Sequence, residues 1–250
     1  MMGKVYLVGA GPGAVDLLTV RAARLLAQAD VVLHDALIGE DVLALASRAE
    51  KIAVGKRCGA HSTSQRFINK RLVDAARRCK VVVRLKGGDP MLFGRAHEEI
   101  DALAAAGIGC EVVPGVTAAL AAAADARLSL TRRGVSRSVA FVTPRIGEGE
   151  NPGAWANAAA AADTTVIYMG AGDAIAVTTA LAAAGVALTT PVALVESASQ
   201  PGCTIHAGML AGLPGLAAQR GNGPALIIVG AVCAELAASL APTSRRAAAG

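Results

Sequence analysis

The first 115 residues alternate short apolar runs with longer segments of helical spacing, and this alternation limits the fold more than any other feature. Runs at Lys4–Val8, Val31–His34 and Val81–Leu85 predict strands, the last of them in the middle of a covered parallel sheet. The other predicted elements of this half are strands at Lys51–Val54 and Glu111–Val113, and helices at Val15–Gln28, Glu40–Arg48, Ser64–Arg78 and Gly94–Ala106. The pattern therefore predicts an α/β unit with five strands.

A second set of strands follows an Ala-rich helical run at Thr117–Ala124. The predicted strands are Val139–Thr143, Thr165–Met169, Pro191–Val195, Thr204–Ala207 and Ala225–Val229, and the predicted intervening helices are Asp173–Ala184 and Met209–Ala218. The sequence thus predicts two α/β lobes, at residues 1–116 and 117–241, with a ligand cleft between them. Residues 242–250 are expected to form a disordered tail.

The composition excludes several classes of protein. Hydrophobic residues make up 54% of the chain and aromatic residues only 2%, so the core is aliphatic. No run approaches the roughly 20 apolar residues that a membrane-spanning helix needs, and no export signal is visible, so we expect a cytoplasmic protein without a membrane partner. The five cysteines are dispersed, and no histidine stands at ligand spacing from them, which predicts neither disulfides nor a metal site.

The net charge of +5 favours an anionic partner. The basic residues form no long block, and the few aromatic residues offer no stacking platform for single-stranded nucleic acid. A small acidic substrate is therefore expected in preference to nucleic acid.

The segment "GAGPGA" at residues 9–14 has the order of a dinucleotide-binding turn, with a strand before it and an acid, Asp35, after the next strand. Pro12 removes one backbone donor from any phosphate cradle. Asp16 is expected to cap the following helix, which places a carboxylate where phosphate charge would lie. The segment is therefore a dinucleotide-binding turn, a loop for a ligand of another kind, or a plain tight turn.

Further motifs along the chain indicate which kind of protein contains this segment. In order along the chain stand "VYLVGAGPG", "VVLHDALI", "AVGKRCGAH", "VVRLKGGDPMLFGRAHEE", "VVPGVTAALAAAA", "LSLTRR", "VIYMG" and "PVALVE". Together they resemble the tetrapyrrole methylase family, and within it the uroporphyrinogen-III C-methyltransferases, from Val5 to about Gly230. The resemblance implies a two-lobed fold with a mostly parallel N-terminal sheet and a mixed C-terminal sheet. It also implies a homodimer that methylates uroporphyrinogen III twice, with S-adenosylmethionine as cofactor and no metal.

The resemblance further implies which residues bind S-adenosylmethionine. Those expected to line its pocket are Pro12, Gly87, Gly88, Asp89, Leu92, Thr117, Ala118, Met169, Ala198 and Ala225. Glycines after a buried strand let the backbone approach a ligand closely. Asp89 offers a carboxylate to ribose hydroxyls or to the methionine ammonium group.

Methylation requires a proton to leave the macrocycle. On the resemblance, Asp35 corresponds to the proton acceptor and Lys56 to the proton donor. Arg95 and Glu98, three residues apart on one helix, form an alternative catalytic pair. Which of these groups is the base stays open.

The carboxylates of the substrate need cations, and arginine can bind them with two hydrogen bonds. The residues expected to surround the substrate are Lys56, Arg57, Arg95, Arg132 and Arg133, with His61 as a further donor.

Four alternatives remain at this stage. The chain could methylate a later precorrin, bind RNA through its basic clusters, transfer hydride from a nicotinamide, or carry a tetrapyrrole without catalysis. The resemblance favours methylation of uroporphyrinogen III over all four. The pathway that uses the product is not determined by the sequence.

Overall fold

The computed structural model describes residues 3–55, 65–146, 151 and 153–240. Contacts within the chain divide it into two compact units, Met1–Ala118 and Ala119–Gly250. The division falls between Ala118 and Ala119, whereas the sequence places the domain limit at 116.

The first unit is built on a parallel five-stranded sheet. Its strands are β1 (Lys4–Gly9), β2 (Val31–His34), β3 (Glu50–Ala53), β4 (Val81–Lys86) and β5 (Cys110–Val113). Their order is β3-β2-β4-β1-β5, and every neighbouring pair is parallel. The predicted parallel sheet is confirmed, with strand limits that differ by no more than one residue from the prediction.

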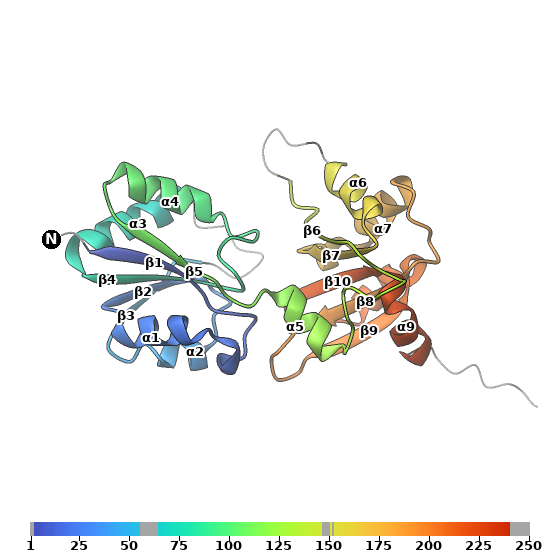
Figure 1. Cartoon of the computed structure of the whole chain (residues 1–250), viewed down its shortest axis with the longest axis horizontal. Helices are drawn as coiled ribbons and strands as arrows, with labels where there is room; N and C mark the ends of the chain where they lie inside the picture. The colour runs from blue at the N-terminus through green and yellow to red at the C-terminus, as the bar shows by residue number, and fades with distance from the viewer. Residues whose placement is uncertain (1–2, 56–64, 147–150, 152, 241–250) are drawn as a thin grey trace, which may run out of the picture. The chain divides into compact units, whose positions relative to one another are not determined.

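Helices cover both faces of this sheet, which explains why its strands are apolar on both sides. Figure 1 shows α3 (Gln65–Arg78) and α4 (Ala96–Ala105) on one face, and α1 (Val20–Gln28) and α2 (Glu40–Ala44) on the other. Each face has its own buried aliphatic cluster. Residues such as Leu72 and Leu103 lie in the first cluster, and residues such as Leu26 and Val42 lie in the second.

The segment after β1 departs from the predicted helix Val15–Gln28. It forms a short 3-10 turn at Val15–Leu17 and then α1, which begins after Thr19. The Thr19 side chain accepts a hydrogen bond from the amide of Ala22 at 3.1 Å. The expectation that Asp16 caps the helix is therefore wrong, because a threonine three residues later fills that position.

The second unit contains a mixed sheet, which confirms the predicted class. Its strands are β6 (Val139–Val142), β7 (Thr164–Tyr168), β8 (Pro191–Glu196), β9 (Thr204–Met209) and β10 (Ala225–Gly230). The order is β6-β7-β10-β8-β9. Only β6 and β7 are parallel, and the other three pairs are antiparallel.

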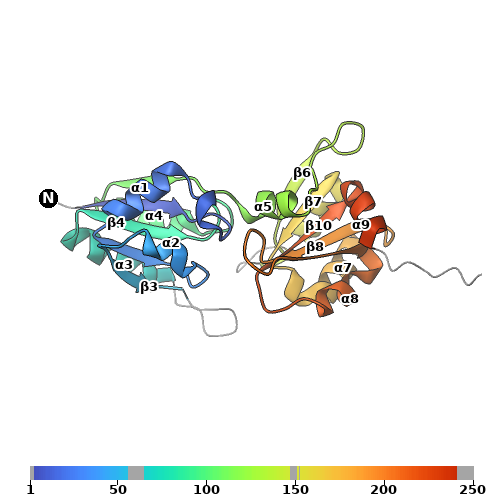
Figure 2. The same cartoon turned by 90° about the horizontal axis from the view of Figure 1, so that it is seen from below.

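Helices also lie on both faces of the second sheet. Figure 2 shows α7 (Ala174–Ala183) and α8 (Leu213–Ala218) on one face and α9 (Ala234–Leu240) on the other. The core on the first face includes Leu181, Leu194 and Leu213. The remaining helices are α5 (Ala118–Asp125) and α6 (Ala154–Ala161). The sequence did not predict α6 or α9.

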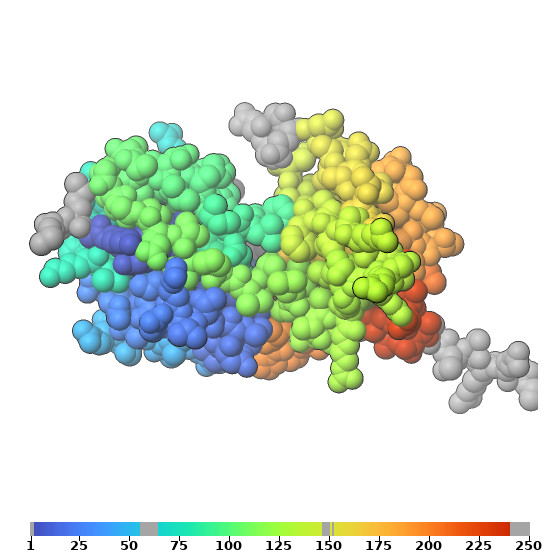
Figure 3. Space-filling model, in the orientation of Figure 1, coloured from blue at the N-terminus to red at the C-terminus, as the bar shows by residue number. Residues whose placement is uncertain are grey.

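The segment that follows α5 lies on the surface of the second unit, as the space-filling view shows (Figure 3). Residues Thr131–Val135 are all exposed. Among the described residues, no helix is both long and apolar enough to cross a membrane.

Candidate functional site

Four strands of the first sheet bring the predicted site residues of this unit to one edge. Because β1, β2, β4 and β5 are parallel, their carboxyl ends meet there. This is the edge at which open α/β sheets bind ligands. The segments that leave it carry Pro12, Asp35, the turn Gly87–Asp89, and Thr117.

The loops after β1 and β4 are joined by their backbones. The amide of Gly88 donates to the carbonyl of Gly11 at 2.8 Å, and the amide of Gly11 donates back to the carbonyl of Gly88 at 3.2 Å. The amide of Ala10 also donates to the carbonyl of Lys86 at 2.8 Å. Pro12, which directly follows Gly11, is thereby held beside the Gly87–Asp89 turn.

Glycine is required where these loops meet the chain after β5. A Cβ atom on Gly9 would lie 2.6 Å from the Cα of Gly115 and 2.7 Å from the carbonyl oxygen of Gly88. A Cβ atom on Gly115 would also collide with that oxygen. The three backbones therefore pack against one another at distances that no other residue allows.

Gly87 has a different role, because a Cβ atom there would meet no atom of the described residues within 4 Å. Its backbone is exposed. Gly88 has a φ of +66°, and a Cβ atom on it would lie 3.9 Å from the Cα of Thr117. The turn thus offers open backbone to a ligand, with Thr117 and Ala118 beside it.

The carboxylate of Asp89 binds the backbone on two sides. One oxygen accepts from the amide of Met91 at 2.8 Å, and the other accepts from the amide of Gly115 at 3.0 Å. The amide of Leu92 donates to the carbonyl of Asp89 at 3.3 Å. Asp89 therefore joins the turn after β4 to the chain after β5, and each oxygen keeps lone pairs for a ligand.

Asp35 follows β2 and lies over a buried arginine. Nη2 of Arg84 donates to Oδ1 of Asp35 at 2.5 Å. The Asp35 side chain is 33% exposed, whereas that of Arg84 is 2% exposed. The predicted proton acceptor thus has one side toward solvent and one side fixed from within the sheet.

Arg84 belongs to a cluster of buried charges. Its Nε donates to Oε1 of Glu99 at 3.0 Å, and Nζ of Lys86 donates to the same oxygen at 3.1 Å. Nε2 of Gln65 donates to it as well, at 3.1 Å. Glu99 is fully buried. Desolvation lowers the pKa of Lys86, and the neighbouring Arg84 charge lowers it further.

The sequence interpretation missed Arg84, Lys86 and Glu99. The sequence pattern predicts a continuously apolar strand at this point, and in the following helix it singles out Glu98, as a partner of Arg95, and not Glu99. The spacing held a signal. Arg84 and Lys86 are two residues apart on one face of β4, and Glu99 lies between Ala96 and Leu103 on the buried face of α4.

The two side chains of the alternative catalytic pair, Arg95 and Glu98, are in direct contact. Arg95 donates from Nε to Oε1 of Glu98 at 2.6 Å and from Nη2 to Oε2 at 2.8 Å. The hydrogen bond from Arg95 lowers the pKa of Glu98. Arg95 has a φ of +55° at the start of α4, which is uncommon for a side chain of this size.

The predicted substrate-binding residues are only partly placed. Lys56, Arg57 and His61 lie outside the described residues. Arg132 donates to the carboxylate of Glu235 at 2.6 Å, and both side chains are more than half exposed. Arg133 is exposed.

The predicted cofactor residues of the second unit also share one sheet edge. Strands β7 and β8 end where β10 begins, because Leu226 pairs with Tyr168 and Ala225 pairs with Glu196. Met169, Ala198 and Ala225 lie at this edge. Met169 has a φ of +57° and is 47% exposed, whereas Ala198 is buried.

Acidic side chains, buried Glu196 and exposed Asp125, hold the loops of this edge. Glu196 accepts from the amides of Gly221 at 2.7 Å and Gly223 at 2.6 Å. The amide of Ser199 donates to Asp125 at 2.6 Å. Ser197 and Ser199, on either side of Ala198, both have positive φ. The Asp125 side chain thus holds the loop that carries Ala198, and Glu196 holds the neighbouring loop that precedes β10.

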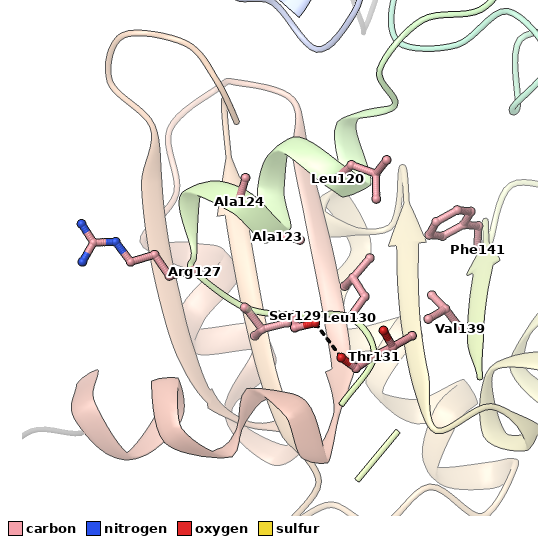
Figure 4. Close-up of a pocket in the computed structure, with 10 residues that line it drawn as sticks. Leu120, Ala123, Ala124, Arg127, Ser129, Leu130, Thr131, Val139 and Phe141 are labelled. Atoms are coloured by element: carbon pink, nitrogen blue, oxygen red, sulfur yellow. Dashed lines mark hydrogen bonds between the residues drawn. The ribbon is translucent and has the colours of Figure 1, made fainter. Parts of the chain in front are cut away.

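An open, mostly apolar groove of about 540 Å³ lies elsewhere in the second unit. Leu120 of α5 and Phe141 of β6 point into it, and Arg127 points away (Figure 4). Oγ of Ser129 donates to the carbonyl of Thr131 on its floor. None of the predicted site residues lines this groove.

Each of the two α/β units has loops of constrained backbone at one sheet edge, and in open α/β sheets such an edge is where small molecules bind. The chain belongs to the Tetrapyrrole (Corrin/Porphyrin) Methylases, whose family model matches residues 4–214. It is 48% identical over 232 residues to a siroheme synthase of Pseudomonas fluorescens. That match covers 92% of this chain and 50% of the relative, so the chain spans about half the length of the curated relatives it matches.

Solved structures agree with this assignment. A uroporphyrin-III C-methyl transferase of Thermus thermophilus, complexed with S-adenyl homocysteine, matches with a TM-score of 0.81 and 41% identity. The match covers 92% of this chain and 98% of that one. A cobalt precorrin-4 methyltransferase matches with a TM-score of 0.79 and 31% identity, over 92% of this chain and 95% of that one.

Proposed function

We propose that this chain is an S-adenosylmethionine-dependent C-methyltransferase that converts uroporphyrinogen III, by two successive methylations through precorrin-1, to precorrin-2. The observation that carries the proposal is the likeness to the Thermus thermophilus enzyme, at 41% identity over 98% of that chain. Some of the sequence motifs that led to the same expectation, such as the one that contains the turn Gly87–Asp89, lie on loops of the two sheet edges. The curated relatives are about twice as long as the part that this chain matches. The proposal therefore concerns methyl transfer alone and includes no activity of the rest of those relatives.

The residues of the first sheet edge fit the cofactor. Gly87 leaves open space where any other residue would carry a side chain, and Asp89 holds the turn with oxygens that retain lone pairs. Pro12 provides a rigid wall beside this turn, and Leu92, Thr117 and Ala118 complete the set. From the second unit, Met169, Ala198 and Ala225 are the proposed contacts. When bound, S-adenosylmethionine supplies a methyl group on a positively charged sulfur that is already strongly electrophilic.

The reaction needs a base for the proton that leaves the macrocycle. Asp35 is the proposed acceptor, because its carboxylate is partly exposed at the sheet edge and is fixed on one side by Arg84. Lys56 is the proposed donor. The Arg95–Glu98 pair is the alternative. Glu98 is the less suitable base, because both of its carboxylate oxygens already accept hydrogen bonds from Arg95.

The eight carboxylates of the substrate call for cations. Arg57, Arg132, Arg133 and His61 are proposed to bind them. Arg132 would exchange its exposed partner Glu235 for a substrate carboxylate, which costs little because exposed ion pairs contribute about 0–1 kcal/mol.

The assembly and the cellular setting are further parts of the proposal. On the family resemblance we propose a homodimer in the cytoplasm, without nucleic-acid or membrane partners. The net charge of +5 and the scarcity of aromatic residues support a small anionic substrate.

A second candidate is methylation of a later precorrin, which the match to the cobalt precorrin-4 methyltransferase at 31% identity favours. Incubation of the purified chain with S-adenosylmethionine and either freshly reduced uroporphyrinogen III or a later precorrin separates the two. We expect S-adenosylhomocysteine to form with uroporphyrinogen III. Formation only with the later precorrin would replace the first proposal by the second.

A further inference from the structure

The carboxylate of Asp35 is bound by a guanidinium group that the protein holds immobile. Nη2 of Arg84 donates to Oδ1 of Asp35 at 2.5 Å. Among the described residues, no donor lies on Oδ2 of Asp35. Oδ1 is thus fixed by Arg84, and Oδ2 can bind a partner at the sheet edge.

Arg84 is fixed by contacts on its other sides. Its Nε binds Glu99 at 3.0 Å, and its Nη1 donates to the carbonyl of Leu85 at 3.1 Å, with the carbonyl of Leu33 at 3.5 Å. These partners lie on α4, β4 and β2, the elements that pack together at this point. Since the side chain is only 2% exposed, the guanidinium has no room to swing away.

Glu99 in turn is held by more than Arg84. Its Oε1 also accepts from Lys86 at 3.1 Å and from Gln65 at 3.1 Å. The chain of contacts therefore runs from α3 and α4 through the middle of the sheet to Asp35. A buried ion pair is often no more stable than an apolar replacement, so stability alone does not account for this arrangement.

We propose that Arg84 is a positioning residue for the proton transfer: it holds the Asp35 carboxylate in one orientation, and Glu99 anchors Arg84 for this task. This inference rests on the proposed role of Asp35. Arg84 itself touches neither substrate nor cofactor in this scheme, and acts only through Asp35.

The test is a double-mutant cycle on methyl transfer. Arg84→Lys keeps the charge, but one ammonium group cannot bind Glu99, two carbonyls and Asp35 in the geometry of a planar fork. We expect its kcat to fall by about 10²-fold, the loss typical of a misplaced catalytic group. Binding of S-adenosylhomocysteine, measured by calorimetry, should stay the same. In the Asp35→Asn background the same substitution should change kcat by no more than on the order of twofold.

Lys4→Gln is the control, because Lys4 is a cation of the same sheet that pairs with Glu111 and not with Arg84, Glu99 or Asp35. Its effect on kcat should be equal in both backgrounds. If Arg84→Lys also acts equally in both backgrounds, its role is structural and the proposal is wrong.

Two further activity measurements separate this proposal from the ones on which it rests. Full activity of the Asp35→Asn variant would refute the proposed role of Asp35. Absence of methyl transfer by the unmodified chain would refute the proposed reaction itself. If Arg84→Lys does not fold, Glu99→Gln in the same cycle loosens the same guanidinium from its other side. Equal effects of Glu99→Gln in both backgrounds would then overturn the assignment.

Discussion

At the scale of single residues, the first sheet edge depends on glycines with opposite tasks. Gly9 and Gly115 are glycines because backbones meet there, so a side chain would break the fold. Gly87 is a glycine although the fold leaves room for a side chain, which points to a ligand as the reason. The two kinds of glycine can therefore be separated by experiment.

Substitution of Gly87 by alanine tests this distinction. Because a Cβ atom there meets no described atom within 4 Å, we expect the free energy of unfolding to change by less than about 1 kcal/mol. The affinity for S-adenosylhomocysteine should fall at least about tenfold, since the new methyl group occupies the ligand's space. Calorimetry and urea unfolding measure the two quantities.

Gly109→Ala is the control, because it also meets no described atom within 4 Å but lies before β5 at the opposite edge of the sheet. It should leave both quantities unchanged. A Gly87→Ala variant that binds S-adenosylhomocysteine as well as the unmodified chain would remove Gly87 from the pocket.

Asp89 offers a second test at this scale. Asp89→Ala removes the acceptor for the amides of Met91 and Gly115 and the group proposed to bind the ligand. Hydrogen bonds to charged groups contribute about 1.5–3 kcal/mol, so the affinity for S-adenosylhomocysteine should fall by about 10- to 100-fold. Glu111→Ala, which removes ion pairs with the exposed side chains of Lys4 and Arg21, is the control. Equal calorimetric affinities for the Asp89→Ala variant and the unmodified chain would exclude the carboxylate from binding.

Contacts between residues close together in the sequence are those that local spacing predicts. The glycine turn after β4 and the Arg95–Glu98 pair follow from spacing along one element. The Asp35–Arg84–Glu99 contacts join residues from two strands and a helix, and only the sheet order reveals that β2 lies beside β4. A charged residue in an apolar run is the signal that was available.

At the scale of elements, periodicity predicted the strands well, because the buried strands are short apolar runs with clear ends. The helices α6 and α9 were missed, since their Ala-rich sequences, such as "AWANAAAA", have no strong apolar face. The predicted helix Val15–Gln28 joined two elements that are separated before Thr19.

The start of α1 provides a test at this scale. Thr19→Ala removes the side chain that caps the helix, so we expect a loss of about 1 kcal/mol in the free energy of unfolding by urea. Asp16→Ala changes an exposed residue that does not cap α1, and its effect should stay within about 0.5 kcal/mol. The account of this helix start is wrong if Asp16→Ala proves the more costly of the two.

At the scale of the whole molecule, the two units present their candidate residues in similar ways. In the first unit, Asp89 accepts the amide of Gly115 and lies directly after Gly88, which has a positive φ. In the second unit, Asp125 accepts the amide of Ser199, which has a positive φ, and Glu196 accepts the amide of Gly221. These carboxylate contacts emerge only from the fold.

The proposed homodimer can be tested directly. Light scattering of the purified chain should give a mass of twice 24.9 kDa at micromolar concentration. A mass equal to that of one chain at every concentration would contradict the proposed assembly and leave the proposed reaction standing.

The central claim is that this chain transfers two methyl groups to carbon atoms of uroporphyrinogen III. The measurement is mass spectrometry of the tetrapyrrole after reaction with S-adenosylmethionine that carries a ¹³C-labelled methyl group. We predict a final product with two labelled methyl groups per macrocycle and an earlier product with one. A uroporphyrinogen III that gains no label, while the protein still binds S-adenosylhomocysteine, would contradict the account.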